Sequence, residues 1–373
     1  MAAQVLVIGS ANADLVVPVE RRPRAGETVL GGDLSVAPGG KGANQAVAAA
    51  RLGARVAFAG CLGRDAHGQL LLESLSGAGV DVSGVRHVDG APTGVALISV
   101  TPDGDNAIIV SPGANAHVDV HDVRRSLAPH GSAAGPADAP GTGSADAPGT
   151  GSADAPGTGS DVPRVVVLQL ELPIDVVSAA VRLADDAGAR VVLNLAPPAP
   201  LAPDVLRRCD PLVLNEHEAA TLLRRPSPPH VQHPDTQRPD TQPADVQPAD
   251  VQPPQAQPQQ TQPQPPDAAG VAAAVLALGP RSVVLTMAAA GAVLVRAGIT
   301  VHVAAARVSP VDTTGAGDAL TGALAARLAA GDDLVNALRF AVRVATTATL
   351  RPGAQPSFPF PDEVLPPQPA GCD

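Results

Sequence analysis

The sequence at residues 311–320 reads Val-Asp-Thr-Thr-Gly-Ala-Gly-Asp-Ala-Leu, which is a turn of small residues leading into an expected helix. The backbone N–H groups of Gly315–Gly317 would be free at the helix N-terminus and would point, with the helix dipole, at a bound anion. Asp318 in the first helical turn can accept a proton from a hydroxyl while those groups stabilise phosphoryl charge. A lone Asp there can also simply balance the helix dipole. The two glycines and the preceding Asp312 favour the anion site.

Short apolar runs that read as strands alternate with helical stretches on both sides of this turn. The expected strands are 5–8, 56–59, 95–100, 107–110, 165–170, 191–195, 283–286 and 292–295. The expected helices are 44–52, 67–78, 175–187, 268–278, 319–329 and 334–349. Nearly continuous apolar strands alternating with helices predict an α/β fold, in which helices cover both faces of a mostly parallel central sheet.

Two early stretches depart from this alternation. Residues 13–36 and 92–112 contain strand-like runs with no helix between them, broken by glycine and proline near Gly26 and Pro102. Such patterns are typical of hairpins, and they predict a small separate β-sheet.

Two low-complexity segments interrupt the chain. Residues 132–160 include three consecutive ADAPGTGS units, and residues 226–266 consist of PDTQ, PADVQ and QPQ units with many prolines. The first lacks large apolar side chains and the second favours extended chain, so both are expected to be disordered inserts in surface loops. The remainder of residues 1–373 is the size of one α/β domain.

The composition of the chain argues against several kinds of partner and cellular location. The chain has 373 residues, 1% aromatics and a formal charge of −11, so a nucleic-acid partner is not expected. Its three cysteines, Cys61, Cys209 and Cys372, are far apart, which predicts free thiols in a reducing compartment. No stretch reads as a signal peptide or a bilayer span, so we expect a cytoplasmic protein without a membrane partner.

A second glycine-rich turn, Pro38-Gly39-Gly40-Lys41-Gly42-Ala43-Asn44-Gln45, also opens an expected helix. It lacks the Ser or Thr after lysine of a phosphate-binding Walker loop, and it lacks the dinucleotide-binding spacing. Lys41 is the only lysine of the chain, which suggests that a compact charge is needed here. A plain glycine-rich helix cap remains an equally good interpretation of this turn alone.

Together the two turns resemble the two signatures of the ribokinase-like family of carbohydrate kinases. Residues 39–50 are similar to the first signature, and 312–318 match the second, Asp-Thr-x-Gly-Ala-Gly-Asp. Further similarities are Gly9–Asp14, Gly26–Thr28, Thr93–Ala96, Gly113–Asn115, Gln169–Glu171, Asn215–Glu218 and Gly353–Ser357. The resemblance covers essentially the whole chain outside the two low-complexity segments.

The resemblance implies phosphorylation of D-ribose by ATP at O5, giving ribose 5-phosphate, under a small β lid formed by 13–36 and 92–112. It implies that Asp318 is the general base and that Gly315, Ala316 and Gly317 supply the anion hole. The implied sugar-binding residues are Asn12, Asp14, Gly40, Lys41, Gly42, Asn44, Glu171 and Asp318.

The resemblance also implies a nucleotide site and two metal cofactors. Asn215, Thr286, Gly291 and Gly317 would lie by the nucleotide, and Asn215 with Glu218 would hold Mg²⁺ through water. A potassium ion would be held, mostly through backbone oxygens, by Asp312, Thr314, Ala348, Arg351, Gly353 and Ser357.

Two positions depart from the family pattern. Members usually read Thr-x-Gly-x-x-Gly where this chain has Thr286-Met287-Ala288-Ala289-Ala290-Gly291. If that glycine adopts a positive φ, Ala288 costs about 1–2 kcal/mol. Val342 stands where relatives often place Asn or His near the nucleotide.

Several alternatives remain open at this point. The substrate could be another pentose, a hexose or a nucleoside, because sugar identity depends on pocket shape. The chain could also be a catalytically silent sugar- or nucleotide-binding regulator, although an intact Asp318 motif argues against this. A binding role for the proline-rich segment has little support in its composition. Relatives often dimerise through the lid, and Val16, Val17, Val29 and Leu30 could make an edge-to-edge contact there.

Overall fold

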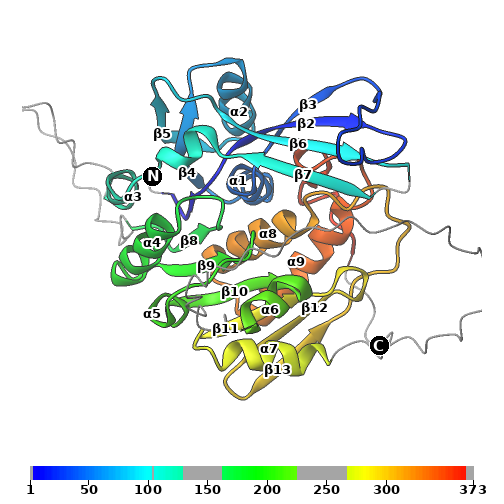
Figure 1. The fold of residues 1–373 in the computed structure, drawn as a ribbon. Helices are drawn as coiled ribbons and strands as arrows, with labels where there is room; N and C mark the ends of the chain where they lie inside the picture. Colours follow the sequence, from blue (N-terminus) through cyan, green and yellow to red (C-terminus); the bar gives the residue numbers. More distant parts are fainter. Residues whose placement is uncertain (1–2, 103–104, 129–161, 225–266, 367–373) are drawn as a thin grey trace, which may run out of the picture.

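The computed structural model describes residues 3–102, 105–128, 162–224 and 267–366. The segments 132–160 and 226–266 and residue Cys372 lie outside these ranges. In the described chain, nine strands form one sheet in the order β13-β12-β11-β10-β9-β8-β1-β4-β5, and four form a second sheet in the order β3-β2-β6-β7 (Figure 1).

The large sheet runs through the middle of the molecule. Its strands are β1 (Val5–Ile8), β4 (Val56–Gly63), β5 (Asp81–Val88), β8 (Val165–Leu168), β9 (Arg190–Asn194), β10 (Cys209–Asn215), β11 (Ser282–Thr286), β12 (Ala292–Arg296) and β13 (Ile299–Val303). The pairs from β5 to β11 are parallel, and β12 and β13 add antiparallel strands at one edge.

Helices cover both faces of this sheet. They are α1 (Lys41–Arg51), α2 (Ala66–Gly77), α3 (Val120–Leu127), α4 (Ile174–Asp186), α5 (Pro203–Leu206), α6 (Glu216–Leu223), α7 (Ala268–Leu276), α8 (Ala316–Ala330) and α9 (Leu334–Ala348). One apolar core lies between the sheet and α1, α2, α8 and α9, and another lies between the opposite face and α3–α7. The α/β fold predicted from strand–helix alternation is confirmed.

Some elements were not predicted. β5 and β13 alternate exposed and partly buried residues because each lies at an edge of the sheet, so neither forms a continuous apolar run. β10 begins Cys209-Asp210-Pro211, which breaks its apolar pattern at the start. The predicted strand 165–170 ends at Leu168, and the two residues after it belong to the candidate site described below.

The smaller sheet consists of β2 (Asn12–Pro18), β3 (Ser35–Gly39), β6 (Gly94–Val100) and β7 (Asn106–Ser111). β2–β3 and β6–β7 pair as antiparallel hairpins, as predicted, and β2 pairs with β6 in parallel. β2 is an interior strand, so Val16 and Val17 cannot make the edge-to-edge contact considered above. The exposed large apolar side chains of this sheet and its connections are Leu30, Leu34, Val36, Leu97, Ile108, Ile109 and Val110.

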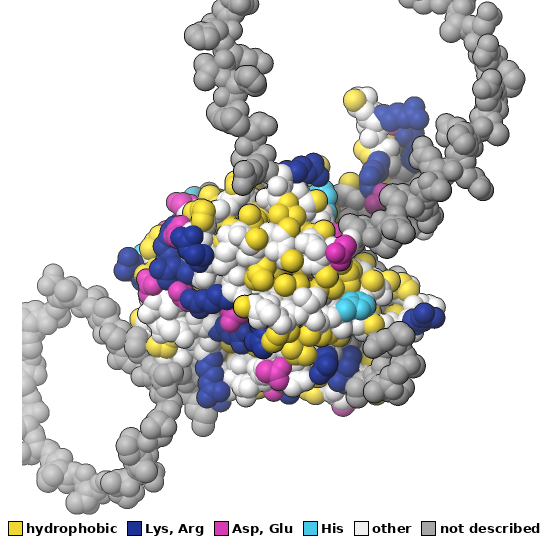
Figure 2. All heavy atoms as spheres, turned by 90° about the horizontal axis from the view of Figure 1, so that it is seen from below, with side chains coloured by type: hydrophobic (Ala, Val, Ile, Leu, Met, Phe, Trp, Pro, Cys, Tyr) yellow, Lys and Arg dark blue, Asp and Glu magenta, His cyan; other side chains and the backbone are white. Residues whose placement is uncertain are grey.

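The surface beyond this sheet carries mixed charge. On the face in Figure 2, basic and acidic side chains lie beside one another around hydrophobic and uncharged groups. Ion pairs such as Arg208–Asp185 and Arg281–Asp185 hold arginines next to acidic groups, at 2.8 Å in both cases. Among the described helices, none combines the length and apolarity needed to cross a bilayer.

Helix α1 approaches the end of β1 unusually closely. A Cβ added to Gly42 would lie 2.7 Å from the Cα of Gly9 and 2.7 Å from the N of Ser10. These are backbone atoms that cannot move aside as a flexible side chain could. The glycines therefore let α1 sit directly over β1, which fixes where Lys41, Asn44 and Gln45 are placed.

We predict that Gly42→Ala lowers the free energy of unfolding by about 1–3 kcal/mol, because the new methyl group overlaps backbone. The matched control is Gly77→Ala in α2, where an added Cβ meets nothing within 4 Å. That change should be neutral or stabilise by up to about 1 kcal/mol, because alanine favours helix. Equal effects of the two changes in urea unfolding would contradict the close contact.

Candidate active site

Several predicted site residues, together with Gln169 and Asn194, gather at the carboxyl ends of neighbouring parallel strands. Gln169 and Glu171 follow β8, Asn194 ends β9, Asn215 ends β10 and Thr286 ends β11. Asn12 follows β1, which lies next to β8. In open α/β sheets, ligands bind at this edge, because loops and helix N-termini converge there.

The N-terminus of α8 faces this edge. Gly315 is its N-cap with φ 75°, a left-handed conformation that favours glycine. Ala316, Gly317 and Asp318 form the first turn, so their N–H groups have no partner within the helix, and that of Ala316 donates to the carbonyl oxygen of Thr313 at 3.2 Å. The turn predicted from residues 311–320 is therefore present, and it can hold an anion.

The carboxylate of Asp318 is only 7% exposed and accepts one hydrogen bond on each oxygen. Asn44 Nδ2 donates to Oδ2 at 3.0 Å, and Gln45 Nε2 donates to Oδ1 at 2.9 Å. Both donors are in α1, so these bonds join α1 to α8 at the site. They leave lone pairs of the carboxylate free for a substrate hydroxyl.

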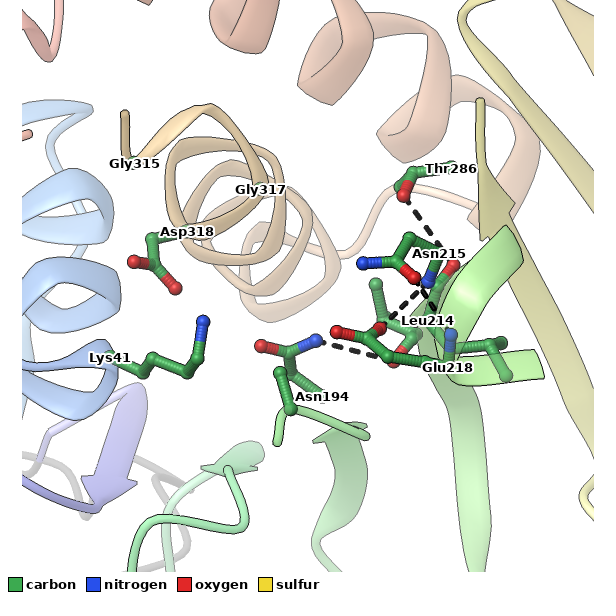
Figure 3. Close-up of a pocket in the computed structure, with 11 residues that line it drawn as sticks. Lys41, Asn194, Leu214, Asn215, Glu218, Thr286, Gly315, Gly317 and Asp318 are labelled. Atoms are coloured by element: carbon green, nitrogen blue, oxygen red, sulfur yellow. Dashed lines mark hydrogen bonds between the residues drawn. The ribbon is translucent and has the colours of Figure 1, made fainter. Parts of the chain in front are cut away.

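Lys41, the first residue of α1, extends its side chain toward Asp318 (Figure 3). The Asp318 carboxylate raises the pKa of Lys41 and outweighs the opposing effect of burial. Lys41 is therefore a cation beside Asp318 and next to the N-terminus of α8. Its compact charge suits a position where a phosphate oxygen has to approach.

The Glu171 carboxylate accepts hydrogen bonds from three segments of the chain. Its Oε2 accepts from Ser10 Oγ at 2.5 Å, from Asn12 Nδ2 at 3.4 Å and from the N–H of Lys41 at 3.1 Å. The carboxylate thus caps the start of α1 and ties it to the end of β1.

Asp14 of β2 lies near the carboxylates of Glu171 and Asp318 and near Lys41. Burial first, then the nearby Glu171 and Asp318, raises its pKa to about 7, although Lys41 opposes this. Asp14 therefore carries a proton through much of the acidic and neutral range in the ligand-free protein. A protonated carboxyl can donate to a hydroxyl as well as accept from one.

Two cavities meet at the N-terminus of α8. The first has about 220 Å³ and is lined by polar groups, among them Lys41, Asn194, Asn215, Glu218 and Asp318. The second has about 430 Å³ and is mainly apolar; its lining includes Ala288, Gly291, Leu320, Val342 and Ala345. Thr286 and Gly317 line both cavities. A ligand with an apolar ring and a chain of phosphates fits such a pair, with its phosphates at the helix N-terminus.

Asn215 and Glu218 form a capping box at the start of α6. Asn215 Oδ1 accepts from the N–H of Glu218 at 2.8 Å, and Glu218 Oε2 accepts from the N–H of Asn215 at 2.8 Å. Burial raises the pKa of Glu218. Both residues line the first cavity, where a carboxylate and an amide can offer oxygens to a hydrated cation (Figure 3).

The segments predicted to hold potassium lie side by side. Asp312 Oδ1 accepts from the N–H of Thr314 at 2.8 Å, and its Oδ2 accepts from the N–H of Gly353 at 2.7 Å. Burial opposes ionisation, but these bonds hold the pKa of Asp312 below its ordinary value. Ala348 ends α9 beside these loops, Ser357 lies in the turn after Gly353, and the Arg351 side chain pairs with Glu363 at 2.7 Å.

Comparison with known proteins agrees with this geometry. A family model for the pfkB family of carbohydrate kinases matches residues 2–133 and 256–361. The chain belongs to the pfkB family of carbohydrate kinases.

Individual pfkB-type relatives match over nearly the full length. The chain is 32% identical to the ribokinase of Schizosaccharomyces pombe, covering 95% of this chain and 94% of that protein. It is 32% identical to the ribokinase of Bacillus subtilis, covering 96% and 97%. The structure of Arabidopsis thaliana ribokinase in complex with ribose and ATP superposes with a TM-score of 0.70, at 28% identity over 97% of each chain.

Ala288, which stands where the family pattern has glycine, has an unusual backbone conformation in this chain. Ala288 has φ 47°, and among the described residues it is the one non-glycine residue with a positive φ. It lines the apolar cavity beside Gly291. An alanine therefore occupies a left-handed position for which the family motif supplies glycine, at a cost of about 1–2 kcal/mol. Val342, the other departure, lines the same cavity with its apolar side chain.

Several site residues were not predicted. Asn194 lines the polar cavity, and Gln45, Gln169 and Gln355 form a buried hydrogen-bonded group behind Asp318. The one available signal was the presence of amides in otherwise apolar or small-residue surroundings, as with Asn44-Gln45 between alanines. That signal indicates burial of polar groups but does not say which group they bind.

We expect Ala288→Gly to raise the free energy of unfolding by about 1 kcal/mol, since it removes the left-handed strain. Ala289→Gly is the matched control, because Ala289 lies in the same turn without a positive φ. It should lower stability by about 0.5–1 kcal/mol through the added chain entropy. Urea unfolding of the two variants measures the difference, and a loss of stability in both would refute the strain.

We predict that Asp14 makes the free energy of unfolding of the ligand-free protein depend on pH. Its pKa is higher in the folded chain than in the unfolded chain, so the folded state binds more protons between about pH 4 and pH 7. The free energy of unfolding of the ligand-free protein therefore falls as pH rises through that interval. Asp14→Asn should reduce this fall, as measured by urea unfolding at pH 5 and pH 8. The same pH dependence in both proteins would show that Asp14 titrates normally.

Proposed function

We propose that this chain transfers the γ-phosphoryl group of ATP to the O5 hydroxyl of D-ribose, giving D-ribose 5-phosphate and ADP. The observation that carries the proposal is the position of Asp318. Its carboxylate lines the polar cavity and belongs to the first turn of α8, where the neighbouring Gly317 lines both the polar and the apolar cavity. Full-length similarity to ribokinases, one of them in complex with ribose and ATP, supports this choice of substrates.

In the proposed reaction, Asp318 accepts the proton of the O5 hydroxyl as the oxygen attacks the γ-phosphorus. The N–H groups of Gly315, Ala316 and Gly317 stabilise the negative charge on the transferring phosphoryl group. Lys41 adds a positive charge beside the same oxygens. The proton ends on Asp318, the new O–P bond forms at O5, and ADP leaves with the electrons of the broken O–P bond.

Ribose would be held beside Lys41 by Asn12, Asp14, Gly40, Gly42, Asn44 and Glu171. These residues come from β2, from α1 and its N-cap, and from the loop after β8, and their amide and carboxyl groups can donate to and accept from neighbouring hydroxyls. The smaller sheet carries Asn12 and Asp14, so we assign it the role of a lid over the sugar. ATP would place its base in the apolar cavity, near Gly291, and its phosphates near Asn215 and Thr286.

The oxygen-rich groups fit two cations. Asn215 and Glu218 would hold Mg²⁺ through water, and the ion would neutralise phosphate charge. Asp312, Ser357 and backbone oxygens of Thr314, Ala348, Arg351 and Gly353 would hold K⁺ beside the α8 turn. We place the enzyme in the cytoplasm.

We also propose a homodimer formed through the smaller sheet. The exposed apolar side chains on β3, β6 and β7, and on the segment before β3, are the support for it. Ile109 is 69% exposed and Leu34 is 58% exposed, which is unfavourable unless a partner covers them.

We predict that Asp318→Asn lowers kcat by 10³-fold or more, because the variant loses a general base worth about 10²–10⁴-fold and its positioning. Ribose affinity measured by calorimetry should change by less than about tenfold, since Asn keeps the shape of the side chain and can still hydrogen-bond. A variant that retains more than about a tenth of the wild-type kcat would exclude Asp318 as the base.

A further inference from the structure

We propose that Gln45 and Gln355 are positioning residues that fix the orientation of the Asp318 carboxylate. The inference rests on the proposed function, because it assigns these side chains a part in the same reaction. Neither residue lines the polar cavity, so each would act through its effect on Asp318, which does line it.

Gln45 acts on Asp318 directly. Its Nε2 donates to Asp318 Oδ1 at 2.9 Å and to Asn194 Oδ1 at 3.1 Å. Its own Oε1 accepts from Gln169 Nε2 at 2.7 Å. The amide could otherwise turn its oxygen toward the carboxylate, but the bond from Gln169 fixes the N–H end toward Asp318.

Gln355 acts through Asn44. Its Nε2 donates to Asn44 Oδ1 at 3.0 Å, which leaves Asn44 Nδ2 to donate to Asp318 Oδ2 at 3.0 Å. Ser74 Oγ donates to Gln355 Oε1 at 2.6 Å and fixes this amide in turn. Arg51 Nη1 donates to the carbonyl oxygens of Gln355 and Phe358, at 2.5 and 2.8 Å, so the backbone is anchored as well.

Both glutamines are fully or nearly fully buried, with 0% exposure for Gln45 and 2% for Gln355. A buried amide is costly unless its groups are paired, and here a donor of Gln45 and, through Asn44, a donor of Gln355 lead to Asp318, while a second bond from Gln45 leads to Asn194. Each oxygen of the carboxylate is therefore held by an amide whose own oxygen is already bound. This arrangement keeps the remaining lone pairs aimed at the cavity.

The charged groups near Asp318 come from several elements. They are Lys41 on α1, Asp14 on β2, Glu171 after β8 and Glu218 on α6. The amides of Gln45 and Gln355 are uncharged, so they can orient the base without adding to this field.

The test uses the full chain with Gln355→Met and Gln45→Met, which keep side-chain length but remove the donors. We expect kcat for ribose to fall 10–100-fold, because small displacements of a base cost about that much. The KM for ribose should stay within about threefold, because neither glutamine lines the cavity. Gln69→Met is the matched control, because the exposed side chain of Gln69 donates a hydrogen bond to Glu73 on the surface of α2, and kcat should be unchanged.

A double-mutant cycle separates positioning from general support of the fold. Asn44→Ala removes the group through which Gln355 acts, so adding Gln355→Met to it should change kcat by less than twofold. If Gln355 supports only the fold, its effect on kcat would be the same in both backgrounds. Equal effects would overturn its assignment.

The pH dependence of kcat in Gln45→Glu distinguishes an effect on Asp318 from general support of the fold. A second carboxyl beside Asp318 favours binding of a shared proton, so the acid limb of kcat against pH should move up by about one unit or more. Gln45→Met should lower the maximal kcat without shifting the acid limb of the pH profile. An unmoved limb in a folded Gln45→Glu protein would overturn the assignment of Gln45, and if that variant does not fold, the Gln45→Met result decides.

The outcomes for the two proposals are distinguishable. A wild-type protein that does not phosphorylate ribose contradicts the proposed function. A wild-type protein that does so, with both methionine variants folded and within twofold of its kcat, contradicts the positioning role alone.

Discussion

The site depends on the hydrogen-bonded contact between α1 and the first turn of α8. Asn44 and Gln45 hold the two oxygens of Asp318, and Lys41 of the same helix places its charge beside them. The close approach of Gly42 to Gly9 sets α1 over the end of β1 and so determines where these three side chains lie. One interface between backbone segments therefore positions Asp318, its hydrogen-bond partners and the neighbouring cation together.

The separation of the two cavities follows from the same interface. α8 begins at Ala316 after its N-cap Gly315, and its first turn stands between the polar cavity lined by Lys41 and the apolar cavity lined by Val342. The backbone of that turn is thus where a phosphate chain would pass from one space to the other. A hydroxyl brought to Asp318 from the polar side would face the end of that chain.

Much of this arrangement could be predicted from the sequence. Alternation of apolar strands and helices predicted the layered α/β fold, and the glycine-rich turns at 39–42 and 315–317 predicted two helix starts that are present beside the candidate site. Edge strands such as β5 could not be recognised, because they lack a continuous apolar run. The positive φ of Ala288 was foreseen only from the family motif, since alanine itself gives no sign of it. The partners of Gln45 and Gln355 depend on contacts between residues hundreds of positions apart, which spacing along the chain does not reveal.

Phosphorus NMR of the product formed by the wild-type chain from ATP and D-ribose tests the central claim most directly. We predict stoichiometric conversion of ATP to ADP with a single new phosphate monoester on C5 of ribose. ADP formation without a sugar phosphate, or phosphorylation at another hydroxyl, would contradict the placement of O5 between Asp318 and the N-terminus of α8.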